Sequence, residues 1–90
     1  MSPTMSDRIK LIEERLSALS PLKLQIIDDS HLHAGHAGSQ NGAGHYTVII
    51  QSALFNDLSR VARQRLVYDA LNDLIPFPIH ALAIQTQTTI

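Results

Sequence analysis

A single stretch divides this chain: Asp29 to His45 holds every glycine of the protein and four of its five histidines. Glycine allows backbone conformations that other residues avoid, so we predict a flexible loop over residues 30–45. Apolar and polar residues alternate before and after it, which is typical of strands. Because strands adjacent in sequence usually pair, the pattern predicts an antiparallel hairpin with this long loop at its tip.

Two segments carry the spacing of apolar residues by three and four that is typical of amphipathic helices. The first covers 9–19, follows the capping candidates Thr4 and Ser6, and should end at Ser20-Pro21 because proline cannot continue a helix. The second places its apolar residues between Leu66 and Ile75 and is followed by a proline-rich break. The sequence therefore predicts one helix before the hairpin and one after it.

Three segments read as strands, over residues 22–26, 46–50 and 79–86. A strand, a helix and a returning strand form a right-handed parallel unit in nearly all proteins, so the third strand should lie parallel to the second. The expected fold is a small α/β (α+β) domain of order αββαβ, with a three-stranded mixed sheet and both helices on one face. In this topology His80, at the start of the third strand, lies at the loop's end of the sheet.

The composition is that of one globular domain spanning residues 1–90, with residues 1–5 expected to be disordered. The net charge of -1 gives no overall attraction to nucleic acid, and the chain has no cysteine. No apolar run predicts a membrane span and no secretory signal is recognised, so we expect a cytoplasmic protein, a monomer or weak homodimer by itself. We recognise no activated nucleophile, no phosphate-binding glycine motif and no paired carboxylates in the sequence, so we do not expect an enzyme.

Histidine is the commonest metal ligand and titrates near neutral pH, so the histidines indicate metal binding or proton transfer. Considered alone, His80 is expected to be a partly buried structural residue in phase with Leu82 and Ile84. The loop histidines His33 and His36 are then solvated, or they bind a metal ion without any partner protein. That alternative, a stand-alone metal sensor, lacks the more specific spacings of zinc motifs.

Several segments, in this order and spacing, resemble the BolA-like family over residues 11–86. They are Ile27-Asp28-Asp29-Ser30, Gly44-His45-Tyr46-Thr47-Val48, Ser52-x-x-Phe55, Arg63-x-Arg65-x-x-x-Tyr68-x-x-Leu71 and Ile79-His80-Ala81-Leu82. The resemblance implies a fold similar to class II KH domains. One position departs from the family, which commonly has Arg-His-Arg where this chain has Arg63-Gln64-Arg65.

The resemblance also implies a partnership with monothiol glutaredoxins, in which the two proteins share a [2Fe-2S] cluster. His80 carries over as one ligand, and His33 as the loop ligand, with His36 as the alternative. The glutaredoxin cysteine and a bound glutathione supply the thiolates, and no cluster is expected on the isolated chain. Two histidines can replace two thiolates on one iron. This predicts an accessory protein in iron-sulfur cluster trafficking or iron sensing.

A second alternative is a DNA-binding transcriptional regulator, a role described for some members of the family that this chain resembles. Its candidate contacts are Arg60, Arg63 and Arg65 on the second helix. Nearby acidic residues, among them Asp57 and Asp69, reduce the local positive potential and weaken this interpretation.

Overall fold

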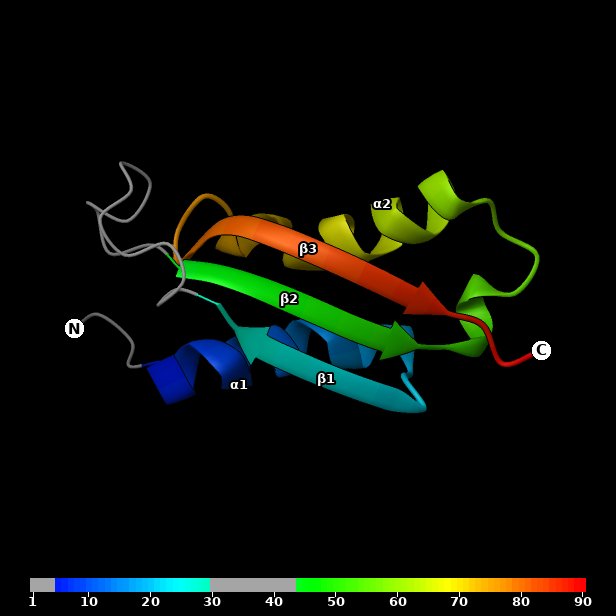
Figure 1. The fold of residues 1–90 in the computed structure, drawn as a ribbon, viewed down its shortest axis with the longest axis horizontal. Coiled ribbons are helices and arrows are strands. Elements are labelled where there is room, and N and C mark those ends of the chain that lie inside the picture. Colours follow the sequence, from blue (N-terminus) through cyan, green and yellow to red (C-terminus); the bar gives the residue numbers. More distant parts are fainter. Residues whose placement is uncertain (1–4, 30–43) are drawn as a thin grey trace.

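The computed structural model describes residues 5–29 and 44–90, which form two helices and three strands (Figure 1). Residues 1–4 of the expected disordered start and residues 30–43 of the expected loop lie outside the described residues. Met5 is helical, and Gly44 and His45, expected at the end of the loop, are already in a strand because both pair with neighbouring backbone. The helices are α1 (Met5–Leu16) and α2 (Arg60–Leu71), and the strands are β1 (Lys23–Asp28), β2 (Gly44–Gln51) and β3 (Ile79–Gln87).

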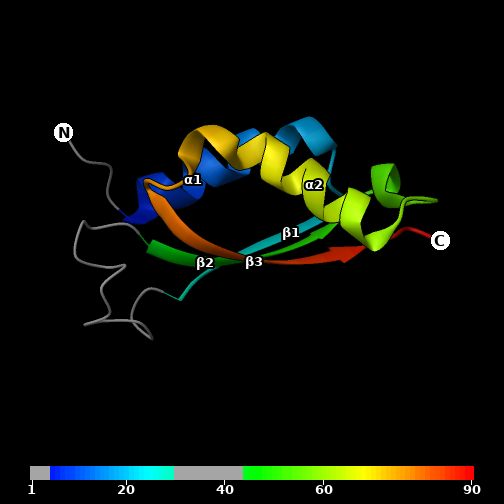
Figure 2. The ribbon, with the colours of Figure 1, turned by 90° about the horizontal axis from the view of Figure 1, so that it is seen from above.

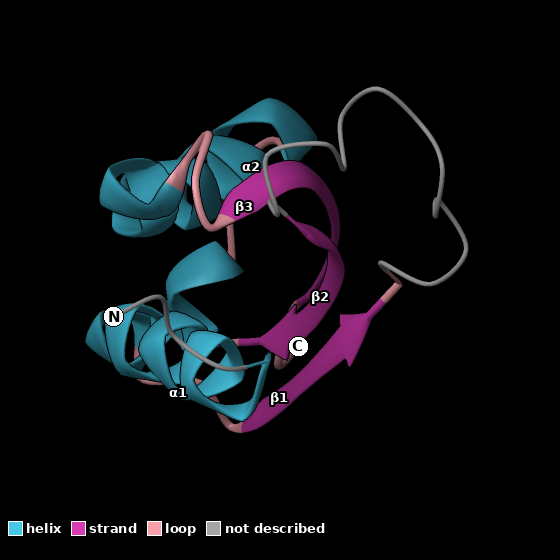
Figure 3. Ribbon diagram, turned by 90° about the vertical axis from the view of Figure 1, so that its left-hand side faces the viewer, coloured by secondary structure: helices cyan, strands magenta, loops and turns pink. Residues whose placement is uncertain are grey.

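The sheet has the predicted topology. Its strand order is β1-β2-β3, with β1 antiparallel and β3 parallel to the central strand β2. Both helices lie on the same side of the sheet (Figure 2). The sheet bends around them, so that its other face is turned away from both helices (Figure 3). No helix among the described residues is long and apolar enough to cross a membrane.

Helix α1 presents Ile12 and Leu16 to the core, and both side chains are fully buried. A 3-10 turn over Ser17–Leu19 continues it, and Ser20 ends it in the left-handed region with φ of 49°. The predicted end of this helix is therefore confirmed. Ser6 lies inside α1 and cannot be its N-cap, while the other capping candidate, Thr4, lies outside the described residues.

The first strand begins one residue later than the sequence pattern indicates. The sequence predicts a strand from residue 22, but 68% of Leu22 is exposed and β1 starts at Lys23. Leu24 and Ile26 point toward the helices and are half-buried. The strand also extends to Asp28, because Asp28 still pairs with Tyr46 of β2.

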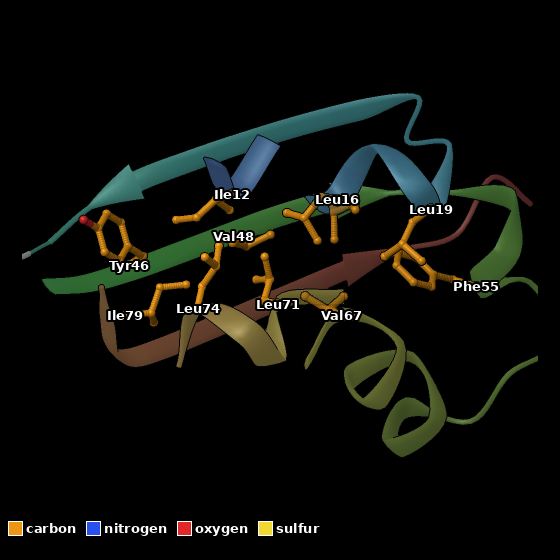
Figure 4. Close-up of a cluster of buried hydrophobic side chains, with 11 residues drawn as sticks. Ile12, Leu16, Leu19, Tyr46, Val48, Phe55, Val67, Leu71, Leu74 and Ile79 are labelled. Atoms are coloured by element: carbon orange, nitrogen blue, oxygen red, sulfur yellow. The ribbon is translucent and has the colours of Figure 1, made fainter. Parts of the chain in front are cut away.

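The hydrophobic core lies between the sheet and the two helices, and β2 contributes every second residue to it (Figure 4). Tyr46, Val48 and Ile50 point inward and at most 2% of each is exposed. The turn after β2 adds Phe55, which is fully buried. The same turn places the buried Ser52 so that its hydroxyl donates to the carbonyl of Leu19 at 2.6 Å. This bond joins the turn after β2 to the 3-10 turn that follows α1.

Helix α2 is fastened to the outer edge of β3 by two side chains. Gln64 donates from Nε2 to the carbonyl of Ile84 at 3.1 Å, and the Tyr68 hydroxyl donates to the carbonyl of Leu82 at 3.2 Å. The four-residue spacing on the helix matches the two-residue spacing on the strand, since both correspond to about 6 Å. Gln64, the departure from the family pattern, therefore holds α2 against the edge of the sheet.

An exposed ion pair joins α1 to the 3-10 turn Asn72–Leu74 that follows α2: Nη2 of Arg15 and Oδ2 of Asp73 are 2.8 Å apart. The hydrogen bond from Arg15 holds the pKa of Asp73 below its usual value. Because the folded-state pKa is lowered, the pair stabilises the fold above the ordinary pKa of aspartate, and this contribution is lost as pH falls through the lowered value. We expect Arg15→Gln to raise the Asp73 pKa in an NMR titration. Arg60→Gln, at the far end of α2, should leave it unchanged.

Candidate functional site

The strands β2 and β3 change register at their loop-side end. Gly44 pairs with Ile79, but the next residue, His45, pairs with Ala81. His80 is therefore an extra residue in β3, and it forms a β-bulge of a kind that is rare between parallel strands. Ile79 is fully buried, and His80 is exposed.

The bulge changes the direction in which His80 points. Uninterrupted alternation places it in phase with Leu82 and Ile84, whose side chains pack against the core. The expectation of a partly buried structural histidine, made from the strand pattern alone, is therefore wrong, because the extra residue shifts the alternation. The prediction that His80 lies at the loop's end of the sheet is confirmed by the pairing of Gly44 with Ile79.

His45 is the neighbour of His80 on the outer face of the sheet. Their ring centroids are 5.3 Å apart and their planes are inclined by 58°. His45 lies between Gly44 and Tyr46, both buried, so its side chain points away from the helices. The sequence analysis places His45 at the end of the predicted loop and does not pair it with His80, whereas His45 belongs to β2. The signal that could have linked the two residues is that each lies at the start of one of two parallel strands.

A shallow hollow of about 210 Å³ lies on this part of the sheet, lined by residues of β2 and β3 and by the end of β1. Its lining residues are Asp29, His45, Tyr46, Thr47, Ala81, Leu82 and Ala83. The Thr47 hydroxyl donates to the carboxylate of Asp29, whose backbone N–H donates to the His45 carbonyl at 2.8 Å. These bonds hold the end of β1 against the strand that carries His45.

On the helix side of the sheet, the same end is covered by Tyr46, by Arg8 of α1 and by Phe77 of the segment before β3. The Arg8 guanidinium lies 5.2 Å from the ring centroid of Phe77, a cation–π distance. Burial raises the pKa of Tyr46, and the neighbouring Arg8 opposes that rise. The start of β3 is thus packed on the helix side of the sheet, whereas His80 is exposed.

The other predicted ligands, His33 and His36, lie outside the described residues, and with them the site of the stand-alone metal sensor. Within residues 5–29 and 44–90, no three histidine, aspartate or glutamate side chains are grouped closely enough to hold a metal ion together. The described residues therefore bring together two imidazoles, those of His45 and His80.

The three arginines proposed for DNA contact do not form one surface stripe. Arg63 donates from Nε to the carbonyl of Leu58 at 3.0 Å and is half-buried. Arg60 and Arg65 are exposed but lie about 140° apart around the helix axis, since each residue turns it by about 100°. Ser59 caps this helix by accepting a bond from the N–H of Ala62.

Comparison with known proteins gives one consistent family. The sequence model of the family described as BolA-like protein matches residues 16–90. The chain is 42% identical to BolA-like protein 1 of Mus musculus, over 79% of this chain and 50% of that protein. It is 35% identical to the DNA-binding transcriptional regulator BolA of Escherichia coli (strain K12), over 86% of this chain and 71% of that protein. The chain thus spans half the length of the mouse protein.

A solved structure extends the similarity to the whole fold. The BolA domain of SufE1 from Arabidopsis thaliana matches the present fold with a TM-score of 0.81 and 36% sequence identity, covering 96% of both chains. The αββαβ order and the mixed sheet predicted from the sequence are therefore shared with an experimentally determined domain of related sequence.

Proposed function

The chain belongs to the BolA-like family, and from this premise we propose that it binds a monothiol glutaredoxin and supplies histidine ligands to a bridging [2Fe-2S] cluster. Its role is then that of an accessory protein in iron-sulfur cluster trafficking or iron sensing. The observation that supports this most directly is the bulge that turns His80 onto the open sheet face. Bulges are frequent beside functional sites, where they redirect a side chain.

The donor set suits such a shared cluster. Iron-sulfur irons are usually held by thiolates, but two histidines hold one iron in Rieske centres. This chain has no cysteine, and its described residues offer histidines without a third nearby ligand, so it is suited to hold part of a cluster. His80 is the first ligand, and the family resemblance assigns the second to His33 or His36. The partner's cysteine and glutathione supply the thiolates.

Anaerobic reconstitution of a monothiol glutaredoxin with glutathione, iron and sulfide, with and without this chain, tests the proposal. We expect a heterodimer with one [2Fe-2S] cluster, whose visible circular dichroism differs from that of the glutaredoxin alone. The isolated chain should form no cluster under the same conditions. An unchanged spectrum together with no complex on gel filtration would contradict the proposal.

DNA binding is a second candidate, favoured by the name of the Escherichia coli relative. In this chain its contacts are Arg60 and Arg65, because the Arg63 guanidinium is already bound to a backbone carbonyl. Such binding must weaken steeply with added salt, since phosphate contacts release counterions. The net charge of -1 restricts it to a local contact. Salt-dependent binding to a DNA duplex that is lost in the Arg60→Ala/Arg65→Ala variant distinguishes this function from the first.

A further inference from the structure

We propose that His45 is the second imidazole of the His80 site, so that the chain presents a two-histidine metal half-site on the open face of its sheet. The inference deepens the proposed function and rests on it for the identity of the cluster. The pair itself can be tested with a bare metal ion. It replaces a ligand expected from the loop by one that the fold already places beside His80.

The separation of the two rings matches that of two imidazoles on one metal ion. With metal–nitrogen bonds of about 2.0–2.1 Å, two histidines on a tetrahedral ion have ring centres roughly 5 Å apart. The centroids of His45 and His80 are 5.3 Å apart, and their planes are inclined rather than stacked. The spacing of the two rings is therefore that of two imidazoles that share one metal ion.

His45 pairs with Ala81, and the bulge residue His80 is flanked by the paired residues Ile79 and Ala81. His45 lies in the central strand, where its carbonyl accepts from the N–H of Asp29 at 2.8 Å. The N–H of the preceding Gly44 donates to the carbonyl of Pro78 at 2.9 Å, which joins the start of β2 to the segment before His80. Ligands placed on rigid, mutually bonded elements keep a precise geometry and lose little entropy on binding. These backbone bonds thus fix the positions from which the two side chains extend.

The surroundings of the pair also favour a cation. The hollow beside it is lined by polar residues, among them Asp29 and Thr47, and by small residues such as Ala81, which pairs with His45. No lysine or arginine occurs among the described residues that line this hollow, whereas the carboxylate of Asp29 does. A lining without positive charge and with one carboxylate attracts a metal ion rather than repelling it.

The first experiment titrates the isolated chain with Co²⁺ at neutral pH and follows visible absorption and paramagnetic broadening of the histidine NMR signals. We expect broadening of His45 and His80, and at least tenfold weaker binding in both His45→Gln and His80→Gln. The double variant should bind no more weakly than the weaker single variant, because the two residues serve one site. Gln85→Ala, at an exposed position of β3 away from the pair, is the control and should bind as the unaltered chain does. His33→Gln and His36→Gln test the alternative ligands from the loop.

The inference is overturned if His45→Gln, shown to be folded by far-UV circular dichroism, binds Co²⁺ normally while His33→Gln or His36→Gln does not. In the glutaredoxin complex, His45→Gln should alter the visible circular dichroism as strongly as His80→Gln does. An unaltered spectrum of the His45→Gln complex would likewise count against His45. If no complex forms at all, the proposed function fails, whereas the Co²⁺ titration still decides whether the histidines form a pair.

Discussion

Val48→Asp is expected to unfold the protein at neutral pH, whereas Ile49→Asp, at the next position of the same strand, should leave it folded. Val48 is fully buried in the central strand, facing the two helices. An unpaired carboxylate at this position costs several kcal/mol, a large part of the roughly 5–15 kcal/mol that stabilises a typical domain. Ile49 points to the opposite, open face and is only half-buried, so a carboxylate there reaches water.

The pH dependence of Val48→Asp follows from the same burial. The buried site raises the folded-state pKa of the introduced carboxyl, so the destabilisation is smallest at low pH, where this group is neutral, and grows as pH rises. Urea unfolding followed by far-UV circular dichroism measures both variants. If Ile49→Asp were as destabilised as Val48→Asp, the outer face of the sheet would be as closed as the inner one, and His45 would have no open surface to share with a partner.

The sequence was sufficient to predict the order and direction of the strands. Alternation in β2, the breaks at Ser20-Pro21 and at the prolines after α2, and the right-handedness of crossover connections together leave one economical topology. These signals are strong because an error in phase or connection would expose many apolar side chains at once. The start of β1 was placed wrongly at Leu22, since one exposed leucine at a strand end costs little and its hydrophobicity is therefore a weak signal.

The candidate site was predictable only in part. Its location at the loop's end of the sheet follows from topology, and so does the presence of His80 there. The outward direction of His80 does not, because it depends on one extra residue opposite the Gly44–His45 step, which no local pattern marks. The contact between His45 and His80 depends on the same register. The loop ligands His33 and His36 remain predictions from the family resemblance.

A second large effect is expected at His80 within the complex with glutaredoxin. On the proposed function, His80→Ala removes one of the ligands that this chain contributes, and the bridging cluster should be lost. His80→Cys should retain it, because a thiolate is the usual ligand of iron in these clusters. Replacement of an imidazole by a thiolate also adds negative charge, so the reduction potential should fall toward the roughly −400 mV of plant-type ferredoxins.

The introduced cysteine needs a control for position, and Gln85 provides one. Gln85 is exposed on β3, where it pairs with Ile49 on the outer face, but it lies roughly 16 Å along the strand from His80. The variant His80→Ala/Gln85→Cys should therefore not recover the cluster, although it carries the same single thiol. Visible absorption of the reconstituted complex gives the cluster content, and redox titration gives the potential. Recovery in both cysteine variants would show that any surface thiol suffices and that the bulge does not position a ligand; recovery in His80→Cys alone ties the ligand to that position in the fold.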